Sequence, residues 1–177
     1  MRKLKNEELN RPSVEEFKEQ KKNEVIVILD NVRSLNNVGS AFRSSDAFNV
    51  KKLYLCGITG TPPHRDINKT AIGATDSVDW EYVKDTKTLV ERLQSEGWKV
   101  YAVEQAEGAT MLQDFSPETD EKVCYVFGNE VFGVEQEVVS ACDGCLEIPQ
   151  YGTKHSLNIS VTIGVVLWDY VLKSSLK

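Results

Sequence analysis

Three polar segments of this sequence carry the side chains best suited to chemistry. They are DNVRSLNNVGSAFR (30–43) with Asn37 and Arg43, GNEVFGVEQE (128–137) with Glu130, and QYGTKHSLN (150–158) with Ser156 and Asn158. A guanidinium group binds phosphate through paired hydrogen bonds. A nearby carboxylate such as Glu130 can pair with Arg43 or orient it, and hydroxyl and amide groups add further polar contacts. Together the three segments predict a polar ligand site.

Each segment by itself also fits an ordinary structural role. Asn37 and Gly39 can start a helix that leaves Arg43 in solvent, and the glycines of the second segment can be loop residues beside a surface Glu130. In the third segment, Ser156 is expected near the cap of a helix, with His155 an ordinary loop residue. Asn158 then falls in an otherwise apolar helix, where a buried amide is costly unless it is hydrogen-bonded.

Short apolar runs alternate with helical patterns along the chain, and they predict the strands and helices that position the three segments. Strands are expected at 25–30, 52–57, 80–83, 98–103, 122–128 and 145–149, and helices at 13–22, 38–48, 86–97, 134–142 and from Ser156 onward. Residues 58–75 are expected to form a loop, with a short helix at its end. Near-continuous apolar strands alternating with helices indicate an α/β fold with a parallel sheet covered on both faces. In such sheets ligands bind beyond the carboxyl ends of the strands, where all three segments fall.

The motifs that are absent narrow the chemistry. The sequence has no G-x-G-x-x-G after its first strand, no P-loop, no G-x-S-x-G and no histidines at metal-ligand spacing. A nicotinamide-dependent oxidoreductase is therefore disfavoured. Cys142 and Cys145 form a C-x-x-C without a second close pair, and Cys56 and Cys124 lie in expected strands. We expect four free thiols and no metal.

Charge is unevenly placed along the chain. The 177 residues have a formal net charge of −6, yet residues 25–75 carry six Lys and Arg against three Asp and Glu, whereas residues 76–147 carry five against seventeen. This predicts a restricted footprint for a polyanionic partner rather than a generally basic surface. No apolar run reaches the length of about 18 residues that a membrane helix needs, and the N-terminus lacks an apolar signal region, so we expect a cytoplasmic protein.

The three segments, in this order, resemble the SpoU (TrmH-like) family of RNA ribose methyltransferases in the SPOUT class. The matching stretches are LDNVRSLNNVGSAFRSSDAF (29–48), YVFGNEVFGV (125–134) and LEIPQYGTKHSLNISVTIGVVLWDY (146–170). The resemblance covers residues 25–172. We therefore expect a catalytic domain at 25–177 preceded by a short helical extension at 1–24.

The resemblance implies transfer of a methyl group from S-adenosyl-L-methionine to a ribose 2′-hydroxyl of RNA. It also implies a SPOUT fold with a C-terminal trefoil knot, and a homodimer whose active site lies at the subunit interface. The family's positions map as follows: catalytic residues Asn37, Arg43, Glu130, Ser156 and Asn158; cofactor-binding residues Val103, Gly128, Ile148 and Leu157. The QYGTKH segment departs from the more apolar start that many relatives have, and Glu104 stands beside the expected cofactor without an assigned role.

The sequence allows more than one answer about the role of Arg43, the residues that contact phosphate and the RNA substrate. Arg43 either positions the ribose through its phosphate or accepts the hydroxyl proton; a guanidinium is a poor base in water, which favours positioning. Arg33, Arg65 and Lys69 are candidates for phosphate contacts. A compact catalytic domain favours transfer RNA over ribosomal RNA, and the alternatives are a ribosomal RNA methyltransferase or a non-catalytic RNA-binding module of the same fold.

Overall fold

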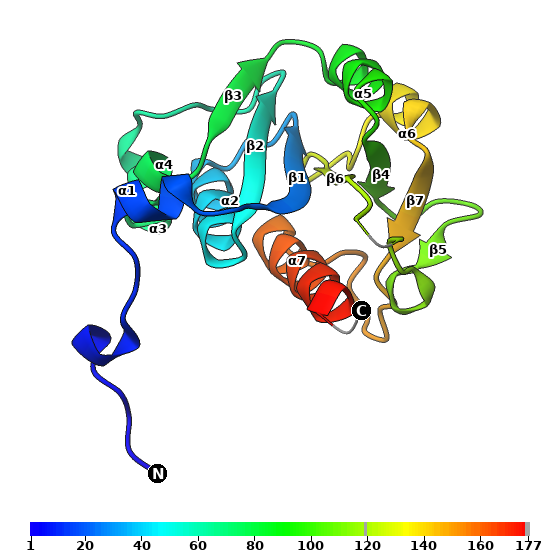
Figure 1. Cartoon of the computed structure of the whole chain (residues 1–177). Helices are drawn as coiled ribbons and strands as arrows, with labels where there is room; N and C mark the ends of the chain where they lie inside the picture. The colour runs from blue at the N-terminus through cyan, green and yellow to red at the C-terminus, as the bar shows by residue number, and fades with distance from the viewer. Residues whose placement is uncertain (119, 176–177) are drawn as a thin grey trace.

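A seven-stranded parallel sheet organises the chain (Figure 1). The computed structural model describes residues 1–118 and 120–175. The strands are β1 (Asn23–Asp30), β2 (Val50–Cys56), β3 (Trp80–Val83), β4 (Lys99–Val103), β5 (Thr110–Met111), β6 (Val123–Phe127) and β7 (Gly144–Glu147). Their order is β3-β2-β1-β6-β4-β7-β5, and every pairing is parallel. The predicted α/β class is therefore confirmed.

Helices cover both faces of the sheet, as the continuous apolar strands predict. They are α1 (Val14–Glu19), α2 (Leu35–Ala47), α3 (Arg65–Ala71), α4 (Ala74–Ser77), α5 (Thr86–Ser95), α6 (Gln136–Ala141) and α7 (Ile159–Ser175), with 3-10 turns η1 (Asn6–Leu9) and η2 (Leu112–Asp114). Figure 1 shows α2 and α7 on one side of the sheet and α5 and α6 on the other. Each face of the sheet has its own hydrophobic core, and alternate residues of β1 contribute to the two. Val27 packs in the core on the side of α2 and α7, and Ile28 in the core on the side of α5.

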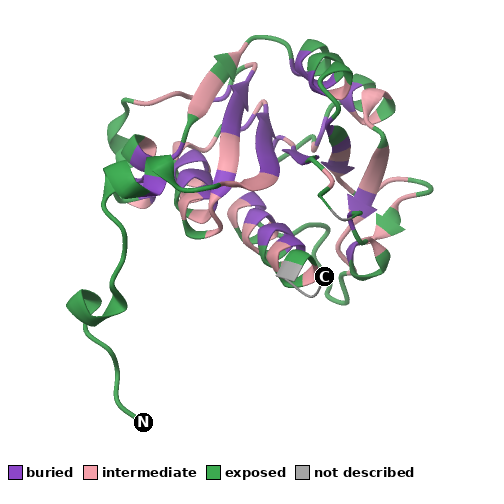
Figure 2. Cartoon of the chain, in the orientation of Figure 1, coloured by how far each residue is buried: buried purple, intermediate pink, exposed green. Residues whose placement is uncertain are grey.

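Burial is greatest in the middle of the sheet (Figure 2). Residues 25–30 of β1 and all of β6 are buried, because both strands have a neighbour on each side and helices above and below. Asp30 is the one acidic residue in this buried part of β1. Its carboxylate accepts hydrogen bonds from the Thr86 hydroxyl at 2.6 Å and from the Glu135 main-chain N–H at 3.1 Å. The end of β1 is thereby tied to the starts of α5 and α6.

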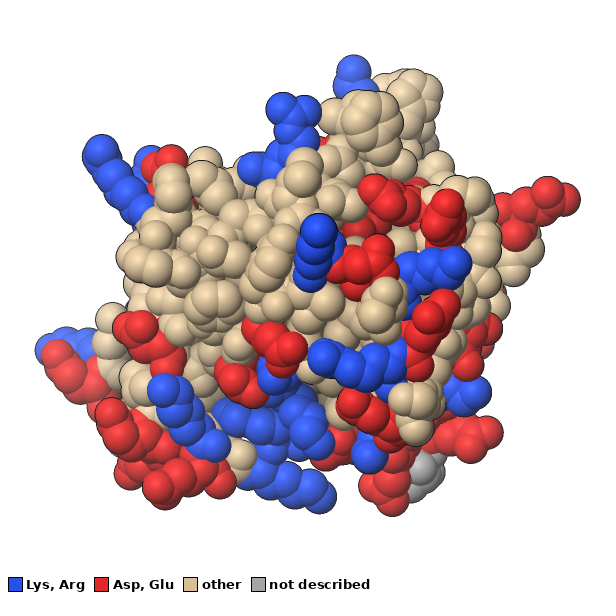
Figure 3. All heavy atoms as spheres, turned by 90° about the horizontal axis from the view of Figure 1, so that it is seen from above, with Lys and Arg blue, Asp and Glu red and all other residues tan. Residues whose placement is uncertain are grey.

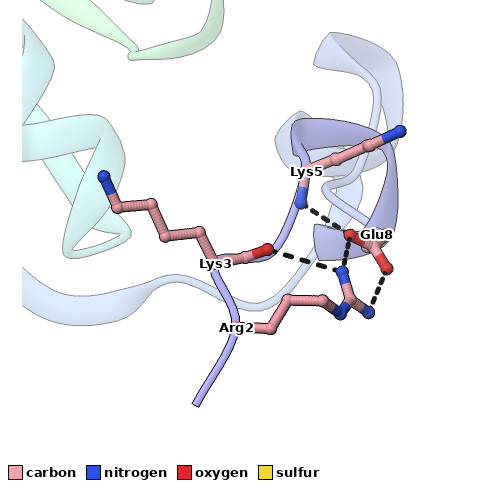
Figure 4. A network of polar contacts seen from close by, with 4 residues as sticks. All are labelled: Arg2, Lys3, Lys5 and Glu8. Atoms are coloured by element: carbon pink, nitrogen blue, oxygen red, sulfur yellow. Dashed lines mark hydrogen bonds and ion pairs between the residues drawn. The ribbon is translucent and has the colours of Figure 1, made fainter.

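Residues 1–12 project away from this body, whereas α1 lies beside α4 and buries Phe17 (Figure 1). The turn η1 is closed locally by the Arg2–Glu8 ion pair at 2.8 Å and by the Lys5 main chain, which donates to Glu8 (Figure 4). The predicted helix at 13–22 is confirmed as the shorter α1, with the S-x-x-E capping box between Ser13 and Glu16.

Several element boundaries differ from the predictions. Helix α2 begins at Leu35, capped by Ser34, so Asn37 and Gly39 lie inside the helix instead of starting it. Gly39 is needed there because a Cβ would lie 2.2 Å from the Ile67 main-chain oxygen of α3. The segment 58–75, expected as a loop with one short helix, forms both α3 and α4. The two-residue strand β5 is too short to leave a pattern in the sequence.

The last helix begins later than predicted. Helix α7 starts at Ile159, and Asn158 takes the capping position: its side-chain oxygen accepts the Ser160 main-chain N–H at 2.8 Å. Ser156 is therefore not the cap, and Asn158 is exposed rather than buried within the helix. The preceding loop has a tertiary contact in place of a helical turn: the main-chain oxygen of His155 accepts a hydrogen bond from the side chain of Gln105, beyond the end of β4.

Candidate active site

A cavity of about 570 Å³ lies at the carboxyl ends of three adjacent strands, β4, β6 and β7. The loops that follow these strands and the first turn of α7 form its walls. All four residues predicted to hold a cofactor line it: Val103, Gly128, Ile148 and Leu157. Three of the five predicted catalytic residues line it as well: Glu130, Ser156 and Asn158.

Hydrogen bonds of Asn129 stabilise the conformation of the loop after β6. The main chains of Asn129 and Gly133 bond to each other in both directions at 2.9 Å. The Asn129 side chain accepts the N–H groups of Val131 and Phe132 and donates to the Asn31 main-chain oxygen at 2.8 Å. Sequence reasoning missed Asn129, although its place between Gly128 and Glu130 is a signal, since an Asn side chain can bond to backbone two residues on.

This loop presents Glu130 to the start of α2. The Glu130 carboxylate accepts the main-chain N–H of Arg33 at 3.0 Å, the N–H of Ser34 at 2.9 Å and the side-chain amide of Asn37 at 3.0 Å. Burial acts to raise the pKa of Glu130, but these hydrogen bonds outweigh it and hold the pKa below its usual value. Glu130 is thus a carboxylate at neutral pH and a weak base.

Asn37 connects Glu130 to the start of the last helix. Its side-chain oxygen accepts a hydrogen bond from the Asn158 amide at 3.4 Å, while its nitrogen donates to Glu130. Three residues from three separate segments, Asn37, Glu130 and Asn158, therefore form one hydrogen-bonded chain at the cavity edge. Ser156 lies near it as an exposed loop residue.

Arg43 lies elsewhere on the protomer. It is exposed on α2, and it lies about 9 Å along the helix axis from Asn37 and about 120° around it. Among the described residues, no hydrogen bond or ion pair joins it to Glu130, whose carboxylate is already occupied by Arg33, Ser34 and Asn37. Of the two alternatives, that Glu130 pairs with Arg43 or orients it, direct pairing is not formed among the described residues of one chain.

The three candidate RNA-contact residues are all exposed. Arg33 follows β1 directly before α2, and its main chain binds Glu130, so its side chain starts beside the Glu130 loop. Arg65 and Lys69 lie one turn apart on α3. Helix α3 packs against α2 at Gly39, which places all three on the side of the molecule that carries α2.

Basic and acidic side chains border one another on the surface. On the face shown in Figure 3, Lys and Arg side chains gather toward the lower middle and have Asp and Glu on either side. Some basic and acidic side chains of the described chain form ion pairs, including Lys52 with Glu81 at 2.9 Å and Lys99 with Asp143 at 3.0 Å.

The cavity suits the cofactor that the family resemblance implies. Its volume falls within the usual range for small-molecule sites, and Val103, Ile148 and Leu157 supply apolar wall for a flat base. Its acidic residues are Glu104, Glu130 and Glu147, and its lining contains neither lysine nor arginine. The Glu147 carboxylate and the main-chain oxygens of the lining are suitable partners for hydroxyl, ammonium and sulfonium groups.

The lining of this cavity includes none of the four cysteines. Cys56 and Cys124 are buried in strands, and burial raises the pKa of Cys56 and of Cys142 to about 12. Thiols with raised pKa values are poor nucleophiles and poor redox centres. Across the described residues, His, Cys, Asp and Glu do not form a cluster of three suited to a metal ion, and none of the helices is both long and apolar enough to span a bilayer.

Comparison with known proteins gives a consistent result. Residues 24–168 match the model of the SpoU rRNA Methylase family. The chain is 32% identical over 165 residues to a tRNA (guanosine(18)-2′-O)-methyltransferase of Thermus thermophilus, covering 92% of this chain and 81% of that enzyme. It is 30% identical over 146 residues to the 23S rRNA (guanosine-2′-O-)-methyltransferase RlmB of Coxiella burnetii, where it spans 82% of this chain but 57% of the relative.

Solved structures agree on the fold. The crystal structure of the Aquifex aeolicus TrmH/SpoU tRNA modifying enzyme matches with a TM-score of 0.82 at 25% identity, over 92% of this chain and 81% of that one. An AdoMet-bound rRNA methyltransferase from Sinorhizobium meliloti matches with a TM-score of 0.78 at 25% identity, over 84% of this chain and 56% of that one. On the sequence motifs, the fold and these matches, the chain belongs to the SpoU family of RNA methyltransferases.

Proposed function

We propose that this protein transfers a methyl group from S-adenosyl-L-methionine to a ribose 2′-hydroxyl of RNA. The observation that carries the proposal is the hydrogen-bonded chain Asn37–Glu130–Asn158 at the edge of the cavity. It joins polar residues of all three family motifs at one place beside a cavity of cofactor size. The relatives are named as 2′-O-methyltransferases of guanosine in tRNA and in 23S rRNA.

The cofactor, when bound, supplies a methyl group on a positively charged sulfur. In the proposed site Val103, Gly128, Ile148 and Leu157 would hold it, with the three apolar side chains against its base. The remaining task of the protein is to hold the ribose oxygen in line with that methyl group. The hydroxyl proton passes to solvent water, because the lowered pKa of Glu130 makes it a poor base.

Glu130 acts in this scheme as an orienting group rather than as the base. Its pKa is held below the usual value, so it has little tendency to accept a proton at neutral pH. It fixes the amide of Asn37, and Asn37 in turn receives the amide of Asn158. Ser156 and Asn158 then offer polar groups to the ribose, and Arg43 binds the neighbouring phosphate in the bidentate manner of guanidinium groups.

Arg43 reaches such a site only if a second protomer contributes it, and we propose a homodimer for this reason. Helix α7 carries an exposed apolar stripe at helical spacing: Val161, Val165, Trp168 and Leu172, which are 51%, 39%, 57% and 44% exposed. Trp168 contacts Phe48 at the end of α2, the helix that bears Arg43. Burial of this stripe against its own copy would carry each Arg43 toward the cavity of the other subunit.

Transfer RNA is the substrate that we favour, with ribosomal RNA as the alternative. The support is the higher coverage of the tRNA relative, 81% of its length against 57% for the 23S rRNA relative. We propose residues 25–177 as the catalytic domain and residues 1–24 as an N-terminal extension. We propose the cytoplasm as the location of the protein. The trefoil knot stays a prediction; the order of the strands places β4 between β6 and β7, so that the loops after these three strands are neighbours.

One experiment tests the function directly. The protein is incubated with S-adenosyl-L-methionine labelled in its methyl group and with separate tRNA and rRNA pools, and the labelled ribose is mapped in the modified RNA. Label at a 2′-oxygen in tRNA is expected. Cofactor binding without transfer to either pool would instead support a non-catalytic RNA-binding module, and label on a base would contradict the proposed chemistry.

A further inference from the structure

Two neighbouring side chains at the end of β4 connect the loops that enclose the cavity. Glu104 reaches the loop after β6: one carboxylate oxygen accepts the Val134 main-chain N–H at 3.0 Å, and the other accepts the Gln105 N–H at 2.8 Å. Gln105 reaches the loop after β7: its side-chain amide donates to the main-chain oxygen of His155 at 2.7 Å. Each of the two loops is therefore bonded to the same short stretch.

Glu104 is anchored firmly enough to serve as a support. Its main-chain N–H donates to the Leu146 oxygen at 3.1 Å, so residue 104 continues the pairing of β4 with β7. Its main-chain oxygen also accepts the Cys145 thiol at 3.3 Å. The carboxylate consequently projects from the rigid end of the sheet.

Gly133 makes room for this contact. Its φ is +70°, a conformation that favours glycine, and a Cβ at this position would lie 2.1 Å from a Glu104 carboxylate oxygen. The loop that carries Glu130 therefore approaches Glu104 through a position where a side chain would block it. The loop after β7 is more open. Its residues 150–158 are exposed, and the hydrogen bond from Gln105 connects them to the end of β4.

We propose that Glu104 and Gln105 are positioning residues that hold the two loops in the conformation that receives the cofactor. This inference rests on the proposed function of the cavity. Without the two contacts, the loops must be ordered when the cofactor binds, and that entropy cost appears as weaker affinity. Neither side chain takes part in the Asn37–Glu130–Asn158 chain, so the methyl-transfer step at saturating cofactor is left nearly unchanged.

The test compares Glu104→Ala, Glu104→Gln and Gln105→Ala with Glu107→Ala, an exposed carboxylate in the same loop, as the matched control. Calorimetry measures the Kd for S-adenosyl-L-methionine, steady-state kinetics gives KM and kcat at saturating RNA, and amide hydrogen exchange is followed in the cofactor-free protein. Glu104→Ala and Gln105→Ala are expected to raise Kd and KM by roughly tenfold with kcat within about twofold of wild type.

Further expected results separate positioning from simple loss of stability. Glu104→Gln keeps one acceptor and should recover part of the affinity. Exchange should rise in residues 129–134 for Glu104→Ala and in 151–157 for Gln105→Ala, before any cofactor is added. If Glu104→Ala fails to fold, Gln105→Ala still decides, because it removes a single contact to an exposed loop.

Three outcomes would overturn the inference. They are Kd values within twofold of wild type for both alanine variants, unchanged exchange in both loops, and a fall in kcat at constant KM, which would indicate direct catalytic contact. Failure of the wild-type protein to bind the cofactor would overturn the proposed function itself, whereas the exchange measurement would still report whether the two side chains hold the loops.

Discussion

Asn37 donates a hydrogen bond to the carboxylate of Glu130 at 3.0 Å, across a separation of 93 residues in the sequence. Asn37 is the third residue of the helix after β1, and Glu130 lies in the loop after β6, the strand beside β1. The bond therefore depends on the parallel pairing of these two strands. It joins the segment proposed to grip RNA to the segment proposed to hold the cofactor.

Loss of this bond should impair both stability and activity. Asn37→Ala removes a charge-assisted hydrogen bond that is partly exposed, so we expect the free energy of unfolding to fall by about 1 kcal/mol. Methyl transfer should fall by roughly tenfold or more, because Asn158 loses its partner as well. Urea denaturation and single-turnover kinetics measure the two effects. Asn36→Ala is the control, since hydrogen bonds use its main-chain oxygen and not its side chain; an equal loss there would refute the assignment.

Removal of Arg43 should separate binding from chemistry. Arg43→Ala is expected to abolish methyl transfer while the Kd for the cofactor stays within about twofold of wild type, because Arg43 lies outside the cavity lining. Loss of cofactor binding would show that Arg43 has been misplaced.

Mixed dimers test whether Arg43 acts in the partner's site. Arg43→Ala and Glu130→Ala homodimers should both be inactive. A heterodimer of the two variants contains one site with intact Glu130 from one subunit and intact Arg43 from the other, so about half of wild-type activity is expected if the sites are shared. An inactive heterodimer that still forms would place Arg43 and Glu130 in the same subunit's site.

The apolar stripe of α7 should be required for association. Trp168→Glu places a charge where the side chain is 57% exposed in the protomer, and burying that charge in an interface is costly. Sedimentation is expected to show dimers for wild type and monomers for the variant, with lost activity. Ile58→Glu, at 66% exposure and away from α7, is the control and should remain dimeric. A dimeric Trp168→Glu protein would exclude α7 as the interface.

The salt dependence of RNA binding should report phosphate contacts. If Arg33, Arg65 or Lys69 binds a phosphate, its replacement by glutamine should reduce the slope of log K against log salt by roughly 0.7 to 0.9. Filter binding over a range of salt concentrations measures the slope. An unchanged slope would remove that residue from the RNA surface.

The depressed pKa of Glu130 predicts the acid side of the stability profile. A carboxylate whose pKa is lower in the folded than in the unfolded state adds stability above the unfolded value, near pH 4.3, and that stability is lost as the pH falls through the folded pKa. Glu130→Gln should therefore be less stable than wild type at pH 7, and the difference should shrink below about pH 4. A difference that stays constant across this range would contradict the role of the charged form.

The sequence by itself determined the fold class and the family. Continuous apolar runs such as VIVIL and CYVF predict strands buried on both faces, and such strands require a parallel sheet covered by helices. The three motifs identified the family because their residue types and their order along the chain are local properties. For the same reason the helices expected at 13–22 and 86–97 are present, as α1 (Val14–Glu19) and α5 (Thr86–Ser95).

Only the tertiary structure decided which residues meet. The sequence allowed Glu130 to pair with Arg43; in the fold its oxygens are taken by Asn37 and by the main chain of Arg33 and Ser34. The start of α7 and the capping role of Asn158 depend on the conformation of the loop that precedes this helix. The hydrogen bond between Glu104 and Val134 depends on the pairing of β4 with β6. Local patterns set the character of each element, but hydrogen bonds between distant segments form only once strand order brings their ends together.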